Sequence, residues 1–333
     1  MRIIKNLVVP TGNIFVGNGD HGDLEFLSIG DYGKNVNLKC DAMGLDREIE
    51  RVHHQEMLPL EEKWVVTIST QYGCSMGCNF CDVPKVGRGK NATLNDMLGQ
   101  VTAAVDMRPE VTYSDRLNIH FARMGEPTWN PQVPFAAEYM YMRWNGLYNI
   151  HPVVSTMMPR HNQWLKNFIH QWMSLKNGMF AGNAGLQLSV NSTSENERKD
   201  MFNGNACSLP EISRIMQDVF PLGRKITLNF AVADYEIDPE LLLWYFNPDY
   251  YIVKLTPMHK THTALKNSVQ TDGDYTTHHP YDAIEEGLKK SGYDVLVFIA
   301  SDAEDMSRIT CGNAILSGSR PNTEWHYGRN DCG

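Results

Sequence analysis

Three cysteines, Cys74, Cys78 and Cys81, lie within one stretch of eight residues and have the spacing C-x3-C-x2-C. They follow an apolar run at residues 64–70 and precede a glycine-rich turn at residues 87–89. This pattern indicates a tight loop that leaves the end of a strand. Three thiolates on one short loop can bind three corners of an iron–sulfur cube, which leaves the fourth iron open to a small molecule. Because an open coordination position is typical of catalytic metal centres, the spacing predicts a catalytic [4Fe-4S] cluster.

Clustered cysteines have two other uses. A structural zinc site pairs a C-x2-C with a second Cys/His pair; His53 and His54 can supply a ligand, but the sequence has no second C-x2-C. A disulfide framework fits less well, because three thiols this close cannot all pair. A non-catalytic module that binds metal through the three cysteines and a histidine therefore stays an alternative.

The composition sets limits on the class of protein. The 333 residues, 42% of them hydrophobic, suit one large α/β domain or one domain with an extension. The net charge of -9 does not favour a polyanion binder, although a local basic groove stays possible. Seven cysteines without a signal peptide predict a reducing, cytoplasmic location. No apolar run approaches membrane-spanning length, so we expect no membrane partner.

From residue 64 onward, short apolar runs alternate with longer segments of helical character. The predicted strands cover residues 64–69, 117–121, 153–156, 185–190, 225–231, 250–255 and 295–299. The predicted helices cover residues 94–106, 133–143, 163–175, 210–220, 239–246 and 281–291. This alternation predicts an α/β barrel or part-barrel with a parallel sheet. Chemistry in such folds gathers at the C-terminal ends of the strands.

The chain before residue 60 has a different pattern. Short apolar runs at residues 13–16, 24–29 and 36–38 are separated by Gly/Asn/Asp clusters, which predict hairpins. We therefore predict a small β-rich N-terminal extension (1–60), the barrel domain (61–315) and a C-terminal tail (316–333).

Polar residues follow three of the predicted strands. Glu126, in a turn that begins with Gly125, can accept hydrogen bonds from an ammonium group of a ligand. Ser155 ends the third strand, and Ser189 and Asn191 end the fourth, where hydroxyl and amide groups suit a ribose and a carboxylate. The alternative is that the Glu-Pro sequence forms only a turn and that Ser and Asn cap the following helices.

Two further residues lie after the later strands. His259 follows the sixth strand and can contact an adenine or a substrate, or be a structural histidine. Cys311 precedes Gly312 on a loop at the catalytic end of the sheet. An accessible thiolate there can act as a methyl-accepting nucleophile. Many cysteines are instead buried and inert.

Taken in this order, the motifs resemble the RlmN/Cfr group of radical S-adenosylmethionine (SAM) enzymes, which methylate adenine carbons in RNA. The C-x3-C-x2-C spacing is common to all radical SAM enzymes, but the ordered combination is much more specific. The resemblance covers roughly residues 49–313 and is carried by segments 70–81, 87–101, 124–130, 155–156, 188–198, 254–257 and 311–312. It implies a radical SAM partial (βα)6 barrel, a [4Fe-4S] cluster on the three cysteines, and SAM.

The resemblance also implies roles for single residues. Glu126 would bind the amine of SAM, while Ser155 and Ser189 would contact its ribose and methionine parts. Cys311 would accept a methyl group from one SAM, and a radical from a second SAM would take hydrogen from that methyl. The resulting carbon radical would add to an electron-poor, amidine-type carbon, which simple displacement cannot methylate. An electron donor such as flavodoxin or ferredoxin would be required.

Several residues depart from the family pattern. Thr67 occupies the position of the second cysteine that releases the family's intermediate, and a hydroxyl cannot attack there as a thiolate. Glu50 resembles the proposed base of the family, but its gap to the cluster loop is longer. Asn191 replaces a family histidine, and His259 replaces a family asparagine. The short N-terminal extension leaves little room for the helical RNA-binding domain of the family.

We therefore predict a radical SAM methyltransferase that acts on an adenine in RNA or a nucleotide, with Cys311 as methyl carrier. A radical SAM enzyme of another reaction type, acting on a small molecule or peptide, is the first alternative. The non-catalytic metal-binding module is the second alternative.

Overall fold

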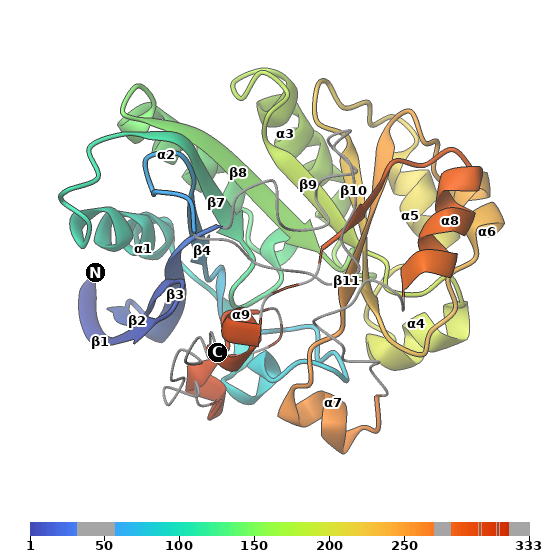
Figure 1. The fold of residues 1–333 in the computed structure, drawn as a ribbon, viewed down its shortest axis with the longest axis horizontal. Coiled ribbons are helices and arrows are strands. Elements are labelled where there is room, and N and C mark those ends of the chain that lie inside the picture. Colours follow the sequence, from blue (N-terminus) through green and yellow to red (C-terminus); the bar gives the residue numbers. More distant parts are fainter. Residues whose placement is uncertain are drawn as a thin grey trace, which may run out of the picture.

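The computed structural model describes residues 1–31, 57–269, 281–298, 300, 302–310, 312 and 314–319. In this part of the chain, parallel strands form one twisted sheet whose order follows the sequence (Figure 1). These strands are β4 (Trp64–Ile68), β7 (Ser114–Phe121), β8 (Tyr148–Thr156), β9 (Gly185–Ser189), β10 (Ile226–Val232), β11 (Tyr251–Pro257) and β12 (Val295–Val297). β12 pairs with β11 and marks one edge of the described sheet, so the barrel is open, as the prediction of a partial barrel requires.

The N-terminal strands extend the same sheet. β1 (Arg2–Val9), β2 (Gly12–Gly19) and β3 (Gly22–Gly30) form two antiparallel hairpins, and β3 pairs antiparallel with β4 from Leu27–Thr67 to Gly30–Trp64. The predicted hairpin turn between residues 19 and 22 is therefore present. The strand predicted at residues 36–38 lies outside the described residues, and the domain boundary near residue 60 stays a prediction.

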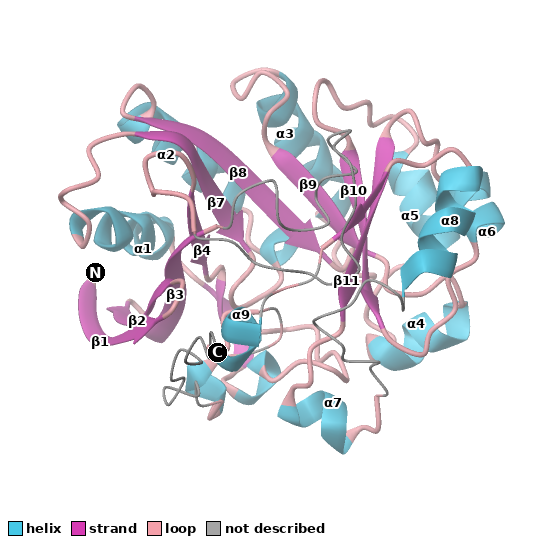
Figure 2. Ribbon diagram, viewed as in Figure 1, coloured by secondary structure: helices cyan, strands magenta, loops and turns pink. Residues whose placement is uncertain are grey.

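Helices in the crossovers cover one face of the sheet (Figure 2). They are α1 (Leu94–Asp106), α2 (Val133–Trp144), α3 (Leu165–Asn177), α5 (Leu209–Met216), α6 (Pro239–Tyr245) and α8 (Asp282–Lys290). Thr93 and Ser208 start α1 and α5 with complete capping boxes, which satisfy backbone N–H groups that have no partner inside the helix. The helix predicted at residues 210–220 covers Leu209–Met216, and Pro221 disfavours helical backbone only at Phe220.

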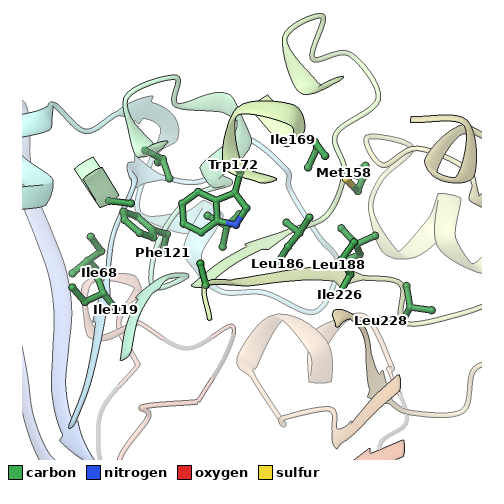
Figure 3. Close-up of a cluster of buried hydrophobic side chains, with 14 of the residues drawn as sticks. Ile68, Ile119, Phe121, Met158, Ile169, Trp172, Leu186, Leu188, Ile226 and Leu228 are labelled. Carbon is green, nitrogen blue, oxygen red and sulfur yellow. The ribbon is translucent and has the colours of Figure 1, made fainter. Parts of the chain in front are cut away.

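Alternation along the strands separates an apolar layer from a more polar inner face. On β7, Ile119 and Phe121 point toward the helices, where Phe121 meets Trp172 of α3 edge to face at 6.0 Å (Figure 3). The side chain between them, His120, lies on the opposite face because strand side chains alternate. Each Å² of apolar surface buried between the sheet and the helices stabilises the fold by about 25 cal/mol. Polar groups can therefore lie on the inner face of the barrel without weakening this apolar layer.

Three short helices follow strands at their C-terminal ends: α4 (Glu195–Met201) after β9, α7 (His262–Lys266) after β11, and α9 (Asp302–Met306) after β12. The sequence pattern did not predict them, because none exceeds seven residues. No helix in the described ranges is long and apolar enough to cross a membrane.

Candidate active site

A small hairpin closes the cysteine loop. After β4 the chain forms β5 (Gln71–Gly73), which pairs antiparallel with β6 (Arg88–Asn91) on the far side of the loop. Gly73 has a φ of +79°, and a Cβ atom there would lie 2.1 Å from the carbonyl oxygen of Gly87. Only glycine permits this backbone and this approach. The glycine-rich turn at residues 87–89 therefore allows the two ends of the cysteine loop to approach each other. Cys74 N donates a hydrogen bond to Gly87 O at 3.1 Å.

The thiols lie in apolar surroundings. Cys78 is buried, and Cys74 and Cys81 are half-buried. They pack in a cluster that includes Met76, Phe80, Met201, Phe202 and Met258, where Phe80 and Phe202 meet edge to face at 6.0 Å. Soft thiolate ligands suit an iron–sulfur cluster, and an apolar shell limits access of water to it. The donor set and its surroundings therefore fit a [4Fe-4S] cluster. In the described ranges, no three His, Cys, Asp or Glu side chains lie close enough to hold a single metal ion.

Asp82 anchors the end of the cysteine loop. Its carboxylate is buried and accepts hydrogen bonds from the N–H groups of His262 (3.2 Å) and Thr263 (3.0 Å) at the start of α7. Thr261 donates its hydroxyl to Phe80 O at 2.6 Å, so α7 holds the loop at two points. Burial raises the pKa of Asp82, but hydrogen bonds from Lys85 and Thr263 outweigh it and keep the pKa below its usual range. Asp82 thus keeps its negative charge, which also interacts favourably with the N–H groups at the start of α7.

Gln71 joins the cysteine loop to the Gly125-Glu126 turn. Its Oε1 accepts from Glu126 N at 2.9 Å and from Ser75 Oγ at 3.3 Å, while its Nε2 donates to Gly89 O at 2.9 Å. Gly125 has a φ of +97°, and a Cβ atom there would lie 2.5 Å from the Gln71 side chain. Gln71 is therefore a positioning residue. Its role was not predicted from the sequence, because only the fold brings these segments together.

The Glu126 carboxylate is fixed on both oxygens. Oε1 accepts from Thr128 N (3.1 Å) and Thr128 Oγ1 (2.7 Å), and Oε2 accepts from Met157 N (2.8 Å), just beyond β8. Burial raises the pKa of Glu126, while hydrogen bonds from Met157, Thr156 and Thr128 oppose the rise. A carboxylate oriented in this way has remaining lone pairs for an ammonium group.

We expect Glu126→Gln to weaken SAM binding by about tenfold to a hundredfold, because a charge-assisted hydrogen bond contributes roughly 1.5–3 kcal/mol. SAM affinity of the wild type should also fall as the pH drops through the raised pKa of Glu126, since protonation removes the charge. Anaerobic titration calorimetry with SAM measures both effects. Glu138→Gln on α2 is the matched control; equal losses in the two variants would contradict the assignment.

The remaining predicted cofactor contacts lie at the ends of neighbouring strands. Ser155 is half-buried on the inner face of β8, and Ser189 ends β9. Asn191 has a φ of +62°, and its Oδ1 accepts from Ala231 N at 3.0 Å, which ties the end of β9 to β10. Asn191 thus has a structural contact in addition to the ligand role that stays a prediction.

His259 forms part of a group at the end of β11. Its Nδ1 lies 3.0 Å from Asp305 Oδ1 on α9, and Thr310 donates its hydroxyl to the same oxygen at 3.3 Å. Burial raises the pKa of Asp305, but the hydrogen bond and charge of His259 outweigh it and hold the pKa below its usual range. The pair therefore fixes the His259 ring beside the segment that leads to position 311.

Cys311 and Glu50 lie outside the described residues, but both neighbours of position 311 are described. Gly312 O accepts from Asp82 N at 2.9 Å and lies 3.8 Å from Cys81 Sγ. On the other side, Arg123 donates to Thr310 O at 3.5 Å. The chain on both sides of position 311 is therefore attached next to the cysteine loop and the Gly125-Glu126 turn.

Arg123 belongs to a buried ion pair that sequence analysis also missed. Its guanidinium bonds to the Glu25 carboxylate of β3 and to Arg308 O at 2.8 Å. Glu25 Oε2 also accepts from Leu316 N at 3.1 Å. One ion pair thus connects the N-terminal hairpins, the end of β7 and the segment from 308 to 316.

Part of the chain is similar in sequence to known RNA methyltransferases. Over 93 residues it is 29% identical to the dual-specificity RNA methyltransferase RlmN of Campylobacter concisus, covering 28% of this chain and 24% of that protein. Over 110 residues it is 32% identical to a probable RlmN of a Synechococcus strain, covering 32% of this chain and 30% of that protein. The matches thus span about a quarter to a third of these relatives. No family model matches the chain.

The likeness in structure covers far more of the chain. A radical SAM methyltransferase from Sphaerobacter thermophilus superposes with a TM-score of 0.64 at 18% sequence identity, covering 94% of this chain and 80% of that one. This likeness confirms the predicted radical SAM partial barrel. Together with the matched RlmN segments, it confirms the predicted resemblance to the RlmN/Cfr group.

Proposed function

We propose that this RlmN/Cfr-like radical SAM protein is a methyltransferase that methylates an electron-poor, amidine-type carbon through a methyl group carried on Cys311. The observation that supports this best is the attachment of Gly312 to the cysteine loop, with its carbonyl oxygen 2.9 Å from Asp82 N and 3.8 Å from Cys81 Sγ. Gly312 directly follows position 311, so its attachment to the loop that would hold the cluster supports a methyl carrier at that position.

Each predicted ligand would hold one part of the cofactors. Cys74, Cys78 and Cys81 would hold the [4Fe-4S] cluster, and Glu126 would hold the SAM amine through the carboxylate that Thr128 and Met157 orient. Ser155, Ser189 and Asn191 would contact the rest of SAM, and His259 the adenine or the substrate. When bound, the cluster and SAM supply one-electron cleavage and a radical able to remove hydrogen from a methyl group.

The chemistry of the target explains the carrier thiol. An amidine-type carbon is not nucleophilic, so it cannot attack the methyl group of SAM directly. The Cys311 thiolate can do so. The residues around position 311 then have to keep the methylated side chain near the site of radical formation and exclude water, which the buried contacts of Thr310 and Gly312 favour.

An adenine in RNA or in a nucleotide is the proposed substrate, because the matched relatives are named RNA methyltransferases. A small acidic electron-transfer protein, flavodoxin or ferredoxin, is the proposed electron donor. The whole chain carries a net charge of -9, which favours a small RNA or nucleotide over a large phosphate-rich surface.

A second candidate is a radical SAM enzyme of another reaction type. It is favoured by Thr67, which stands on β4 where the family has its second cysteine and which pairs in register with His120 of β7. A hydroxyl at this position cannot release a thioether-linked intermediate as a thiolate does.

Peptide mass spectrometry tests the proposal. We expect anaerobically reconstituted protein, incubated with SAM that carries a trideuterated methyl group, to gain one labelled methyl on the peptide that contains Cys311. The Cys311→Ala variant should gain none and should form no methylated product, while still forming 5'-deoxyadenosine. Formation of 5'-deoxyadenosine by the wild type with Cys311 unmodified would instead favour the second candidate.

A further inference from the structure

The inner face of the barrel carries basic side chains in the N-terminal half of its strands. Arg116 of β7 donates its Nε–H group to Asn118 Oδ1 at 3.1 Å, and Asn118 lies on the inner face because it alternates with Ile119. His151 of β8 is aligned in register with Asn118, so it lies on the same face. Both strands run from these residues toward the Gly125-Glu126 turn and the predicted SAM contacts.

Arg224 brings a second guanidinium group to this face. It lies just before β10, and β7 to β10 are neighbours in the sheet (Figure 1). A Cβ atom added at Gly185 of β9 would lie 2.9 Å from Arg224 Nη1. Gly185 is aligned with Val153, which shares the inner face with His151. Gly185 lies in a regular strand, so its missing side chain serves to leave room for the guanidinium group rather than to permit an unusual backbone.

The charges of this group act on one another. Removal from bulk water lowers the pKa of His151 to about 4, and the positive charges of Arg116 and Arg224 contribute to the shift. Limited solvation and the charge of Arg116 also lower the pKa of Arg224, to about 10. His120 responds in the same way: its pKa falls to about 3 through loss of water and the charges of Arg224 and Lys254. The electrostatic potential at this part of the inner face is therefore positive.

The described residues do not neutralise this positive charge. Asp31 is the described acid that acts on Arg116, and it forms an ion pair with Lys63. Neither Arg116 nor Arg224 forms an ion pair of its own with a described residue. The buried Nδ1 atom of His151 likewise has no hydrogen-bond partner in the described part of the chain. A chain with a net charge of -9 thus holds an excess of positive charge at this one place.

A small ligand can reach this part of the inner face. Arg224 is exposed and His120 is half-buried, whereas Phe121 on the opposite face is fully buried. The distance along β9 from Gly185, beside the Arg224 guanidinium, to Ser189, a predicted SAM contact, is about 13 Å. A ligand of nucleotide length can therefore extend from the basic group toward the predicted SAM contacts.

We propose that Arg116, His151 and Arg224 bind a phosphate group of the substrate on the inner face of the barrel. The inference rests on the proposed function, because the nucleotide that carries this phosphate would present its adenine to the methyl carrier. Guanidinium groups suit phosphate, since their N–H groups form paired hydrogen bonds with its oxygens. A phosphate has enough oxygens for two guanidinium groups and for the His151 ring, which can donate from Nδ1. The phosphate belongs to a free nucleotide or to the end of a short RNA.

Ligands with and without a phosphate test the site. AMP and adenosine are titrated by anaerobic calorimetry into the reconstituted protein and into its Arg224→Met and Arg214→Met variants. Arg214 is the matched control, because it is also exposed but lies on α5, outside the barrel. We expect the wild type to bind AMP about tenfold more tightly than adenosine, because charge-assisted hydrogen bonds are the strong ones. Arg224→Met should remove this difference without changing adenosine affinity, and Arg214→Met should leave both affinities unchanged.

A second variant tests the position of the guanidinium group rather than its charge. Gly185→Ala keeps every charged group but places a Cβ atom 2.9 Å from Arg224 Nη1, so the flexible Arg224 side chain has to move. We expect this variant to lose affinity for AMP and to keep its affinity for adenosine. Inorganic phosphate should also protect Arg224, but not Arg214, from modification by phenylglyoxal, measured by peptide mass spectrometry.

The outcomes distinguish this site from the proposed function. A wild type that binds AMP no more tightly than adenosine, or an Arg224 that phosphate protects no better than Arg214, would overturn the phosphate site. Tighter binding of a short 5'-phosphorylated RNA than of AMP would support the site and identify an RNA end as the source of the phosphate, whereas tighter binding of AMP would identify a free nucleotide. Absence of labelled methyl on Cys311 would overturn the proposed function, while protection of Arg224 by phosphate would still decide the site.

Discussion

Replacing Cys78 by alanine is expected to abolish cluster assembly and to lower formation of 5'-deoxyadenosine from SAM by about a hundredfold or more. Replacing a residue that only supports a metal ligand already lowers metal affinity or activity by roughly tenfold to a hundredfold. Loss of a ligand itself should lower them at least as much. Cys78 is the most buried of the three thiols in the loop, which leaves water poor access to replace it. Iron and sulfide content per chain and the yield of 5'-deoxyadenosine measure the effect.

Cys207→Ala is the matched control, because Cys207 is also buried but lies outside the cysteine loop. Burial raises the pKa of the Cys207 thiol to about 11, so it stays protonated and inert near neutral pH. This variant should keep a wild-type amount of iron. Wild-type protein that binds zinc in place of iron and sulfide, or Cys78→Ala protein that cleaves SAM at the normal rate, would contradict the cluster assignment.

Local signals in the sequence were sufficient to predict most of the helices and strands of the fold. The apolar run beginning at Trp64 and the capping box of Thr93 with Asp96 correspond to β4 and α1, and α1 has the predicted bounds Leu94–Asp106. Such signals act between residues that are near in sequence, so one segment reveals them. The assignment of the three cysteines as cluster ligands stays a prediction, and it rests on the same kind of signal, because their chemistry depends on spacing within one loop.

The contacts that position the site could not be predicted in this way. Gln71 meets Glu126 across 55 residues, and Arg123 meets Glu25 across 98 residues. Asp82 caps α7 from about 180 residues away. Glutamine, arginine and aspartate at these positions carry no local signal of their role, because each becomes informative only after the strands are aligned in the sheet. The framework thus followed from local patterns, whereas its positioning residues required the fold.

Breaking the ion pair between Arg123 and Glu25 is expected to have the largest effect on stability. Both side chains are almost fully buried, at 2% and 0% exposure, so Arg123→Met would leave the Glu25 carboxylate without its charge partner. Loss of one member of a buried pair costs about 3–5 kcal/mol in free energy of unfolding. Guanidinium denaturation of the protein without cluster measures this loss directly.

The same variant should also affect methyl transfer, because Arg123 holds the carbonyl oxygens of Arg308 and Thr310 just before position 311. The double variant Glu25→Leu/Arg123→Met separates the two effects. It removes both charges, so much of the stability should return, but the two carbonyls still lack their donor. We therefore expect the double variant to form 5'-deoxyadenosine while transferring less methyl to Cys311 than the wild type. If the double variant regained both stability and full methylation of Cys311, the ion pair would serve only to stabilise the fold. If the double variant regained stability while methylation of Cys311 stayed low, the role of Arg123 in positioning the methyl carrier would be established.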